Sequence, residues 1–295
     1  MADQTPESLM ADAVLSQKED PSALSVMMNN RAIFWGGLLL LIFVVVAIFG
    51  PLFVGDPVAL NPTKRLKPPS AEIFFGSDFL GRDIFSRVIY GARISLAVGI
   101  AVAVISVIVG LFLGLVAGYV RALDAIIMRT MDGLMSIPAI LLAIALISLS
   151  GATLGTVIFA IVIPEIPRVV RLVRAVVLTV RDEPYVEAAI ASGTRLPLIL
   201  SRHILPNTIA PLIVQATYVC ASAMLTESIL GFLGAGIPPE IPSWGNIMSE
   251  GRTYFQISPW IIFFPGVALA LTVLAVNIVG DGLRDTLDPR IARKM

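Results

Sequence analysis

Few residues in this sequence have the chemistry of a catalytic or metal-binding site. The chain contains one cysteine, Cys220, and one histidine, His203, so it cannot form a disulfide within itself or a site of several cysteines or histidines. None of the four lysines follows a glycine, which excludes a glycine-rich phosphate loop ending in Gly-Lys. No spacing of Ser, His and Asp suggests a catalytic triad. We therefore expect a chain that is not an enzyme, with no catalytic residue, metal site or cofactor of its own.

The composition indicates a membrane protein. Of the 295 residues, 57% are hydrophobic and 14% are charged, whereas soluble domains contain about 25% charged residues. The mean hydropathy is +0.89. The 21 basic and 21 acidic residues cancel, so no net charge favours binding to nucleic acid.

Six stretches are apolar and long enough to cross a bilayer as helices. The first is an uncharged run of 22 residues. At about 1.5 Å per residue it reaches about 33 Å, which exceeds the ~30 Å hydrocarbon core. Backbone groups in lipid must bond within their own segment, so we expect an all-α, polytopic membrane helical bundle. The expected transmembrane helices are residues 33–54, 94–120, 125–149, 154 to about 174, 207–234 and 259–279.

The distribution of basic residues orients this bundle. With both termini in the cytoplasm, 14 of the 21 Lys and Arg residues lie in inside segments and 7 in outside segments, as the positive-inside rule favours. Segment 55–93 carries six of the seven outside charges. The expected organisation is a cytoplasmic tail (1–32), a first transmembrane helix (33–54), an outside segment (55–93) and a helical core (94–295).

Two acidic residues lie in apolar surroundings, where charges are expensive and mark a partner or a pathway. Glu165 and Arg168 are three residues apart, a spacing that allows an ion pair on one helix face. Glu227 lies 20 residues after Asn207 in the expected fifth helix. We expect it to face a partner or a water-filled cavity, either as a pathway residue or in a structural ion pair.

A ridge of small residues follows the expected second helix. Gly110, Gly114 and Gly118 repeat every four positions and therefore share one helix face. Such a ridge allows another helix to approach closely. Two interpretations stay open, packing within this bundle or contact with a different membrane subunit.

The inside segment 181–206 has the pattern of two short helices joined by a turn. Pro184 suits a first helical turn, the run 187–189 (Glu-Ala-Ala) favours helix, and Gly193 can end it. An apolar pattern resumes at Leu196. No lipid covers such helices outside the bilayer, so we expect them to occupy a groove in another protein.

The same segment resembles the EAA motif of ABC importer permeases. The string Arg202-His203-Ile204-Leu205-Pro206-Asn207 is similar to the form in the dipeptide/oligopeptide/nickel subfamily, in which His replaces an apolar residue of the general pattern. Segments 75–87, 230–234, 242–245, 250–252 and 277–290 also resemble this subfamily, and the best likeness is to its second, or C-type, permease subunit. The residues that match the motif are Glu187, Ala188, Ala189, Gly193, Ile204, Leu205 and Pro206.

The resemblance implies a transmembrane subunit of an ATP-driven importer with the type I ABC importer permease fold. It implies a multi-pass protein of the bacterial inner membrane, with segment 55–93 in the periplasm and a substrate that is a peptide or a related small solute. The implied partners are a second permease chain in a heterodimer, two ATPase subunits that bind ATP and Mg²⁺, a periplasmic or lipid-anchored solute-binding protein, and membrane lipid.

The resemblance also implies roles for particular residues. The segment from Glu187 through Leu196 to Leu198 would be the coupling helix seated on an ATPase, with Gly193 as its turn. We expect Glu187 to order this segment through a charged hydrogen bond within the loop. On the opposite side, Trp244 and Arg252 would contact the binding protein or shape an outer gate. Together with Glu165 and Glu227, they are the candidate residues of the translocation path.

The main alternative is a secondary transporter driven by an ion gradient. Such proteins carry ionisable residues at the bilayer midplane and often contain internal repeats. No convincing repeat is found in this sequence, and a secondary transporter has no use for an uncovered cytoplasmic helix pair. A membrane enzyme and a scaffold protein are the remaining alternatives.

Overall fold

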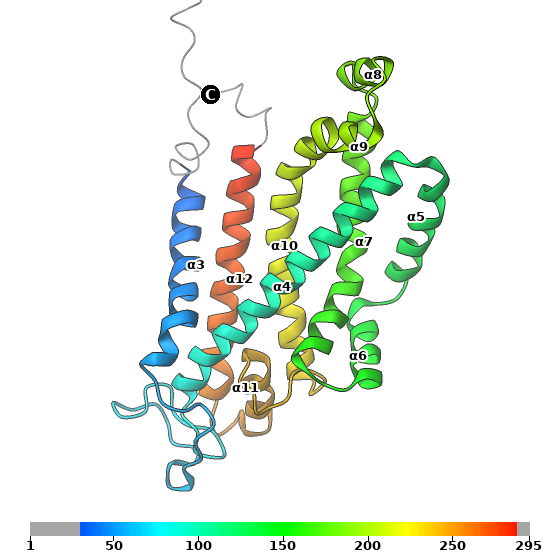
Figure 1. The fold of residues 1–295 in the computed structure, drawn as a ribbon. Helices are drawn as coiled ribbons and strands as arrows, with labels where there is room; N and C mark the ends of the chain where they lie inside the picture. The colour runs from blue at the N-terminus through cyan, green and yellow to red at the C-terminus, as the bar shows by residue number, and fades with distance from the viewer. Residues whose placement is uncertain (1–29, 288–295) are drawn as a thin grey trace, which may run out of the picture.

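The computed structural model describes residues 30–287, and this part of the chain is a helical bundle without a strand (Figure 1). The expected cytoplasmic tail, apart from its last three residues, lies outside the described residues. Helices α3 (Arg31–Phe49), α12 (Trp260–Leu287), α10 (Leu205–Phe232) and α7 (Leu154–Val180) stand side by side in this order. Helix α4 (Ile84–Tyr119) crosses this row diagonally and contacts each of the four.

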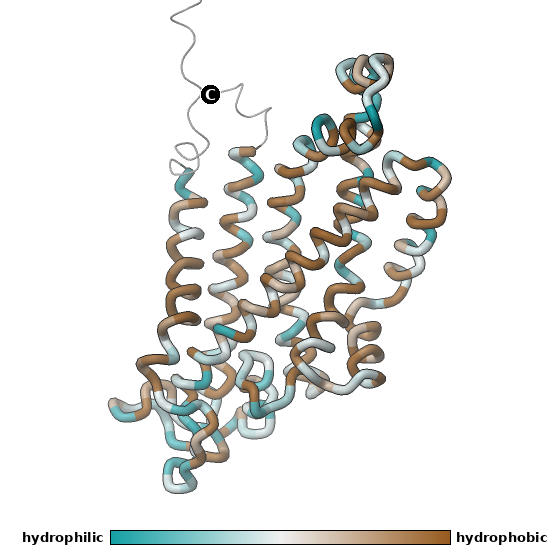
Figure 2. The backbone as a smooth tube through the Cα atoms, viewed as in Figure 1, coloured by the Kyte–Doolittle hydropathy of each residue, from teal (hydrophilic) through white to brown (hydrophobic). Residues whose placement is uncertain are grey.

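The remaining elements lie at the edges and ends of the row. Helices α5 (Arg121–Met135) and α6 (Ala139–Ser150) lie beside α7, and α11 (Trp244–Gly251) lies at one end, against α10 and α12. Hydrophilic residues gather mainly at the two ends of the bundle, whereas α3 is apolar along most of its length (Figure 2). The short elements are η1 (Gly50–Leu52), η2 (Pro62–Lys64), α8 (Pro184–Ala191), α9 (Leu196–Ile199), η3 (Leu200–Ile204) and η4 (Arg252–Tyr254).

Each expected transmembrane helix has a counterpart in the structure. The bent pair of α5 and α6 covers the expected third span, and the two helices together are long and apolar enough for one. Helix α7 has 27 residues and is long enough for a span. It contains Glu165 and three arginines, so it is too charged to be recognised as a span from its composition. Within residues 30–287, four stretches are long and apolar enough to cross a membrane, namely Arg31–Leu52, Ile84–Tyr119, Leu196–Phe232 and Trp260–Leu287.

Two helices differ from the expected spans. The third span is not one helix, because α5 and α6 meet at 88° across the break at Ser136–Pro138. Proline lacks an amide donor and disfavours helical backbone in the residue before it, which accounts for the break. Helix α4 begins at Ile84, ten residues before the expected start at 94. Its N-cap is Asp83, whose side chain accepts a hydrogen bond from the Ser86 amide.

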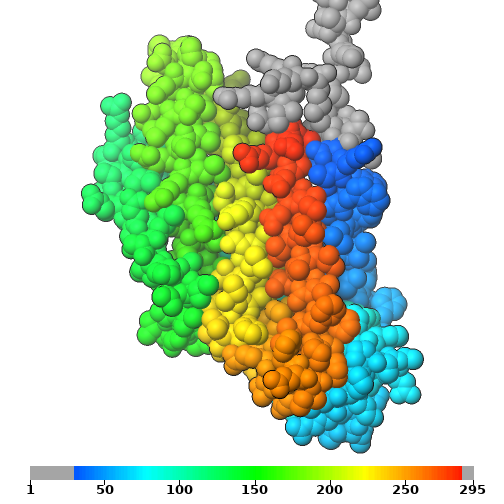
Figure 3. All heavy atoms as spheres, turned by 180° about the vertical axis from the view of Figure 1, so that it is seen from behind, coloured from blue at the N-terminus to red at the C-terminus, as the bar shows by residue number. Residues whose placement is uncertain are grey.

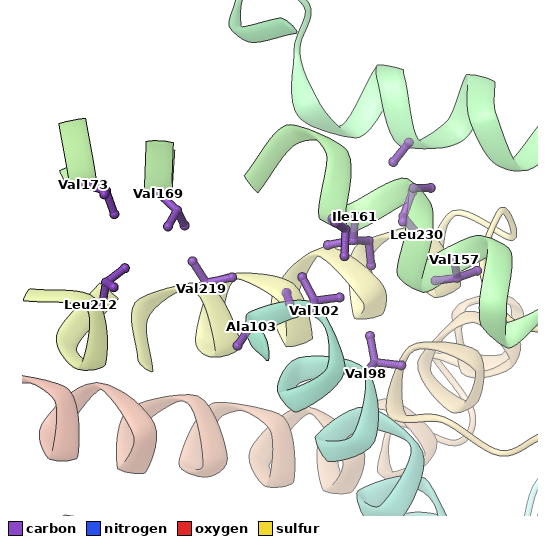
Figure 4. Close-up of a cluster of buried hydrophobic side chains, with 14 of the residues drawn as sticks. Val98, Val102, Ala103, Val157, Ile161, Val169, Val173, Leu212, Val219 and Leu230 are labelled. Atoms are coloured by element: carbon purple, nitrogen blue, oxygen red, sulfur yellow. The ribbon is translucent and has the colours of Figure 1, made fainter. Parts of the chain in front are cut away.

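The glycine ridge of α4 packs inside this bundle, against a ridge of valines on α7. A Cβ added at Gly110 would lie 2.5 Å from Cβ of Val169, and one added at Gly114 would lie 2.6 Å from Cβ of Val173. Gly118 faces Val177 in the same way. Figure 4 shows Val169 and Val173 beside Leu212 and Val219 of α10 in the buried core. The expectation of packing within the bundle is confirmed, and contact of this ridge with another subunit is wrong.

Replacement of Gly114 by alanine tests this packing. We expect Gly114→Ala to destabilise the protein by about 1–3 kcal/mol, because the added methyl group has no space against Val173. Thermal unfolding of the purified protein in detergent should show a lower Tm. In the control Gly133→Ala, on α5, the added Cβ meets nothing within 4 Å, so stability should rise by about 0.5–1 kcal/mol. An unchanged or higher Tm for Gly114→Ala would contradict the close approach of α4 and α7.

Candidate coupling segment and transport path

Helix α8 lies beyond the end of the bundle (Figure 1). Pro184 occupies its first turn, as the sequence pattern predicts, and its N-cap is Glu183. Gly193 follows with φ +77°, a left-handed conformation that only glycine adopts without strain. Helix α9 then continues through η3 into α10 as one helical stretch, Leu196–Phe232. The helical stretch that contains the expected fifth span therefore begins at Leu196, eleven residues before the expected start near 207.

The segment from α8 to α9 is apolar on a surface that the rest of the chain leaves uncovered. The side chains of Tyr185, Ile190, Leu196 and Leu198 are 40–49% exposed. Val186 is buried instead and anchors α8 to the bundle. The exposed apolar surface is therefore available to another protein.

The expected coupling residues divide into an exposed set and a set at the root of the segment. Glu187, Ala188, Leu196 and Leu198 are exposed, and Ala189 is half-buried. Ile204 is fully buried, Leu205 is half-buried and Pro206 is exposed at the start of α10. Asn207 Nδ2 donates to Tyr185 Oη over 3.3 Å, so α8 is tied directly to α10.

The expected hydrogen bond of Glu187 within the loop is absent. Among residues 30–287, no side-chain hydrogen bond or ion pair involves its carboxylate. It lies in the first turn of α8, where the helix dipole favours a negative charge. The carboxylate is exposed, so it is open to a donor from another chain.

Arginines of α7 join this end of the bundle to its neighbours. Arg174 makes a two-bond ion pair with Asp124 of α5, with N–O distances of 2.5 and 2.6 Å. Arg171 pairs with Asp132 at 2.6 Å. Arg181 Nη1 donates to the carbonyl of Gly118 at the end of α4 over 3.1 Å. The root of α8 is thereby fixed to both α4 and α5.

A second polar cluster lies midway along α7 and α10. The Glu165 side chain is buried and accepts a hydrogen bond from Ser222 Oγ over 2.9 Å. Arg168 Nη1 lies 3.4 Å from both oxygens of this carboxylate, so the expected ion pair at this spacing is confirmed. The Arg168 guanidinium carbon lies 5.8 Å from the ring centroid of Tyr218.

A hollow of about 660 Å³ lies between this cluster and the α8 end of the helices. Polar and apolar side chains of three helices, α7, α10 and α12, line this hollow. The lining residues are Leu172, Pro206, Asn207, Ala210, Pro211, Val214, Gln215, Arg284 and Leu287.

The expected positions of Glu227 and Trp244 are wrong. Glu227 is fully buried between α10 and α4, where Ser95 Oγ donates to it over 3.2 Å, so it faces neither a partner nor an open cavity. Trp244 is also fully buried, and its indole N–H donates to the Val88 carbonyl over 3.0 Å. It packs against Gly91 and acts as a core residue, not as an outer contact.

Arg252, in contrast, is exposed at the α11 end. Its guanidinium carbon lies 5.7 Å from the ring centroid of Phe232. This side chain is available to another protein at the end of the bundle opposite to α8.

Sequence reasoning missed an ion cluster at the α11 end. The Asp78 carboxylate is fully buried and pairs with Arg82 at 2.5 Å and with Arg87 at 2.8 Å. Both arginines also contact Glu250 of α11. The charged residues of segments 75–87 and 250–252 were visible, but nothing local indicates that they meet, because 163 residues separate Arg87 from Glu250. We call Asp78, Arg82, Arg87 and Glu250 the outer clasp.

Comparison with known proteins shows what this arrangement is similar to. Residues 106–293 match the family described as binding-protein-dependent transport system inner membrane component. The chain is 59% identical over 266 residues to a probable peptide ABC transporter permease protein of Sinorhizobium fredii, covering 90% of this chain and 91% of the relative. It is 43% identical over 271 residues to a dipeptide transport system permease protein of Alkalihalophilus pseudofirmus, covering 91% and 89%. A probable D,D-dipeptide transport system permease protein of Escherichia coli is 41% identical over 259 residues, with 87% of each chain covered.

Removal of one charge from the outer clasp should be costly. We expect Asp78→Asn to destabilise the protein by about 3–5 kcal/mol, because it leaves two buried arginines short of a partner. Asp132→Asn is the control, since its ion pair with Arg171 is exposed and should contribute less than about 1 kcal/mol. Thermal unfolding of the two purified variants gives the comparison, and equal Tm values would show that the clasp does not hold the α11 end together.

Proposed function

The chain belongs to the family of inner membrane components of binding-protein-dependent transport systems, and on that premise we propose that it couples ATP hydrolysis to solute uptake through α8. In this proposal α8, Gly193 and α9 occupy a groove of an ATPase subunit. One observation carries it, namely an apolar helix pair that lies outside the bundle with Tyr185, Ile190 and Leu198 uncovered. Lipid cannot cover these side chains beyond the end of the spans, so their burial requires another protein.

The proposed complex contains a second permease chain in a heterodimer, two ATPase subunits and a periplasmic or lipid-anchored solute-binding protein. The ATPases would hold ATP and Mg²⁺, since this sequence contains no glycine-rich loop ending in Gly-Lys. Membrane lipid would cover the exposed apolar residues of α3. The permease would thus supply the path and the coupling surface, without an ATPase site of its own.

A movement of α8 would be transmitted to the path along the chain, because α8 is connected to a long helix at each of its ends. At one end α8 follows α7 directly, and at the other end α9 and η3 continue into α10. Glu165 and the hollow lie between α7 and α10, so a rigid shift of these helices would open or close the path beside them. Gly193 would set the angle of α8, and Glu187 would accept a donor from the ATPase.

We propose that α8 and both termini lie on the cytoplasmic side of a bacterial inner membrane. Three of the seven basic residues on the expected outside already have partners, which supports this orientation. Arg82 and Arg87 belong to the outer clasp, and Arg93 donates to the carbonyls of Ala47 and Ile48. Arg252 would then face the periplasm and contact the solute-binding protein.

The proposed substrate is a peptide or a related small solute. The names of the relatives from S. fredii, A. pseudofirmus and E. coli refer to peptides, a dipeptide and a D,D-dipeptide, respectively. A secondary transporter driven by an ion gradient is wrong, because the family to which the chain belongs is defined by dependence on a binding protein.

Substitution of Gly193 tests the coupling role. We expect Gly193→Val to abolish peptide uptake while ATP hydrolysis by the complex continues, because a β-branched residue at φ +77° is strained and turns α8 away from its groove. Uptake of a labelled dipeptide by whole cells and ATP hydrolysis by the purified complex give the two readings.

The matched control is Gly37→Val on α3, where an added Cβ meets nothing within 4 Å, and it should transport normally. Normal uptake by Gly193→Val would refute the coupling role of the turn.

A further inference from the structure

We propose that Glu165, Arg168, Tyr218 and Ser222 form a binding site within the transport path for the free termini of a zwitterionic, dipeptide-sized solute. This inference rests on the proposed function, because it takes the chain to line a peptide path. It adds a site and a chemistry for the solute, whereas the coupling role concerns α8, beyond the C-terminal end of α7. We call these four residues the terminus site.

The terminus site lies at about the middle of the bundle. Glu165 is eleven residues after the first residue of α7, or about 17 Å along that helix at about 1.5 Å per residue. Ser222 of α10 lies beside it, ten residues before the end of its helix. Charged groups at this depth are expensive unless they meet each other, water or a solute.

Helical spacing connects the terminus site with the hollow. Leu172 is four residues after Arg168, and Val214 is four residues before Tyr218, so each pair shares one helix face. Both Leu172 and Val214 line the hollow. Figure 3 shows the face of the molecule on which α10 lies between α7 and α12, opposite to the crossing helix α4 of Figure 1. The hollow therefore ends about one helical turn from Arg168 and Tyr218, on the same faces of α7 and α10.

The ion pair between Glu165 and Arg168 is longer and more exposed than a tight ion pair. The Arg168 side chain is 41% exposed and lies 3.4 Å from the Glu165 oxygens, whereas tight pairs of this kind lie at about 2.7–2.9 Å. Its planar guanidinium retains donors for a second carboxylate and can bind one with two parallel hydrogen bonds. Glu165 is held from its other side by Ser222, so it keeps its position when Arg168 changes partner.

A peptide with free ends fits this arrangement. Its carboxylate replaces Glu165 as the partner of Arg168, and its ammonium group donates to the Glu165 oxygens that are thereby released. Because the Glu165–Arg168 ion pair must be broken before the two new pairs form, part of their energy is lost, and the solute can leave, as transport requires. Tyr218, which is 51% exposed, packs against the solute beside Arg168.

A cysteine introduced at position 218 tests this site in the complete transporter without nucleotide. Cys220 is first replaced by alanine, since it is the only native cysteine. We expect Tyr218→Cys to react with a water-soluble, charged thiol reagent. Leu41→Cys on α3 should not react, because Leu41 is exposed in a helix that is apolar on all sides. Dialanine at about twice its dissociation constant should slow the reaction about threefold, and dialanine amide should slow it much less.

A second variant tests the role of the guanidinium. Arg168→Gln in the Tyr218→Cys background should abolish the difference between dialanine and its amide, and Arg168→Lys should restore part of it. If dialanine and dialanine amide slow the reaction of the Tyr218→Cys variant equally, the terminus site is wrong, but the proposed path is not contradicted. If the thiol of the Tyr218→Cys variant does not react at all, both the terminus site and a path along α7 and α10 are wrong. Neither result bears on the coupling role, which Gly193→Val tests separately.

Discussion

The close contact between the glycines of α4 and the valines of α7 is the constraint on which the rest of the structure depends. Because Gly114 has no side chain, Val173 lies against the α4 backbone, and this buried face fixes the rotation of α7 about its own axis. The other faces of α7 then direct Arg174 toward α5 and Glu165 toward α10. Arg181, which donates to Gly118, joins the last turn of α7 to the same contact. In the proposed mechanism a displacement of α8 would therefore move a rigid pair of long helices, as ATP-driven switching between two arrangements requires.

A second rule concerns the ion pairs of the described residues, most of which lie near the two ends of the bundle. The outer clasp holds the segment before α4 against α11, and the α5–α7 pairs hold the α8 end. Removing one partner of a buried ion pair is costly, so these two sets of ion pairs hold the two ends of the bundle together. Two charged residues differ from these sets: Glu227 is fully buried and accepts a hydrogen bond from Ser95, and Arg168 is half exposed at mid-depth with a long contact to Glu165. This difference in pairing is what separates a structural charge from one that is available to a solute.

The sequence predicted what depends on local composition, and failed where distant residues meet. Apolar runs revealed the spans, and the spacing of Gly110, Gly114 and Gly118 revealed the ridge, although it could not identify Val169 or Val173 as its partners. The start of α4 was missed because Arg87 and Arg93 resemble loop residues until their distant partners are known. Trp244 resembled an interface residue, yet the absence of a side chain at Gly91 allows it to be buried. The motif around Gly193 predicted α8 and its turn, but Glu187 has no partner in the described part of the chain, and no local pattern could supply one.

The side of the membrane on which α8 lies is the most direct test of the account. Ile190→Cys in a Cys220→Ala background places a single thiol on the exposed face of α8, and Arg252→Cys in the same background places one at the opposite end of the bundle. A membrane-impermeant maleimide should label the Ile190→Cys variant only in inside-out vesicles, with protection when the ATPase subunits are bound, and should label the Arg252→Cys variant only in right-side-out vesicles. Labelling of Ile190→Cys in right-side-out vesicles alone would place α8 outside the cell and contradict its role as the coupling helix.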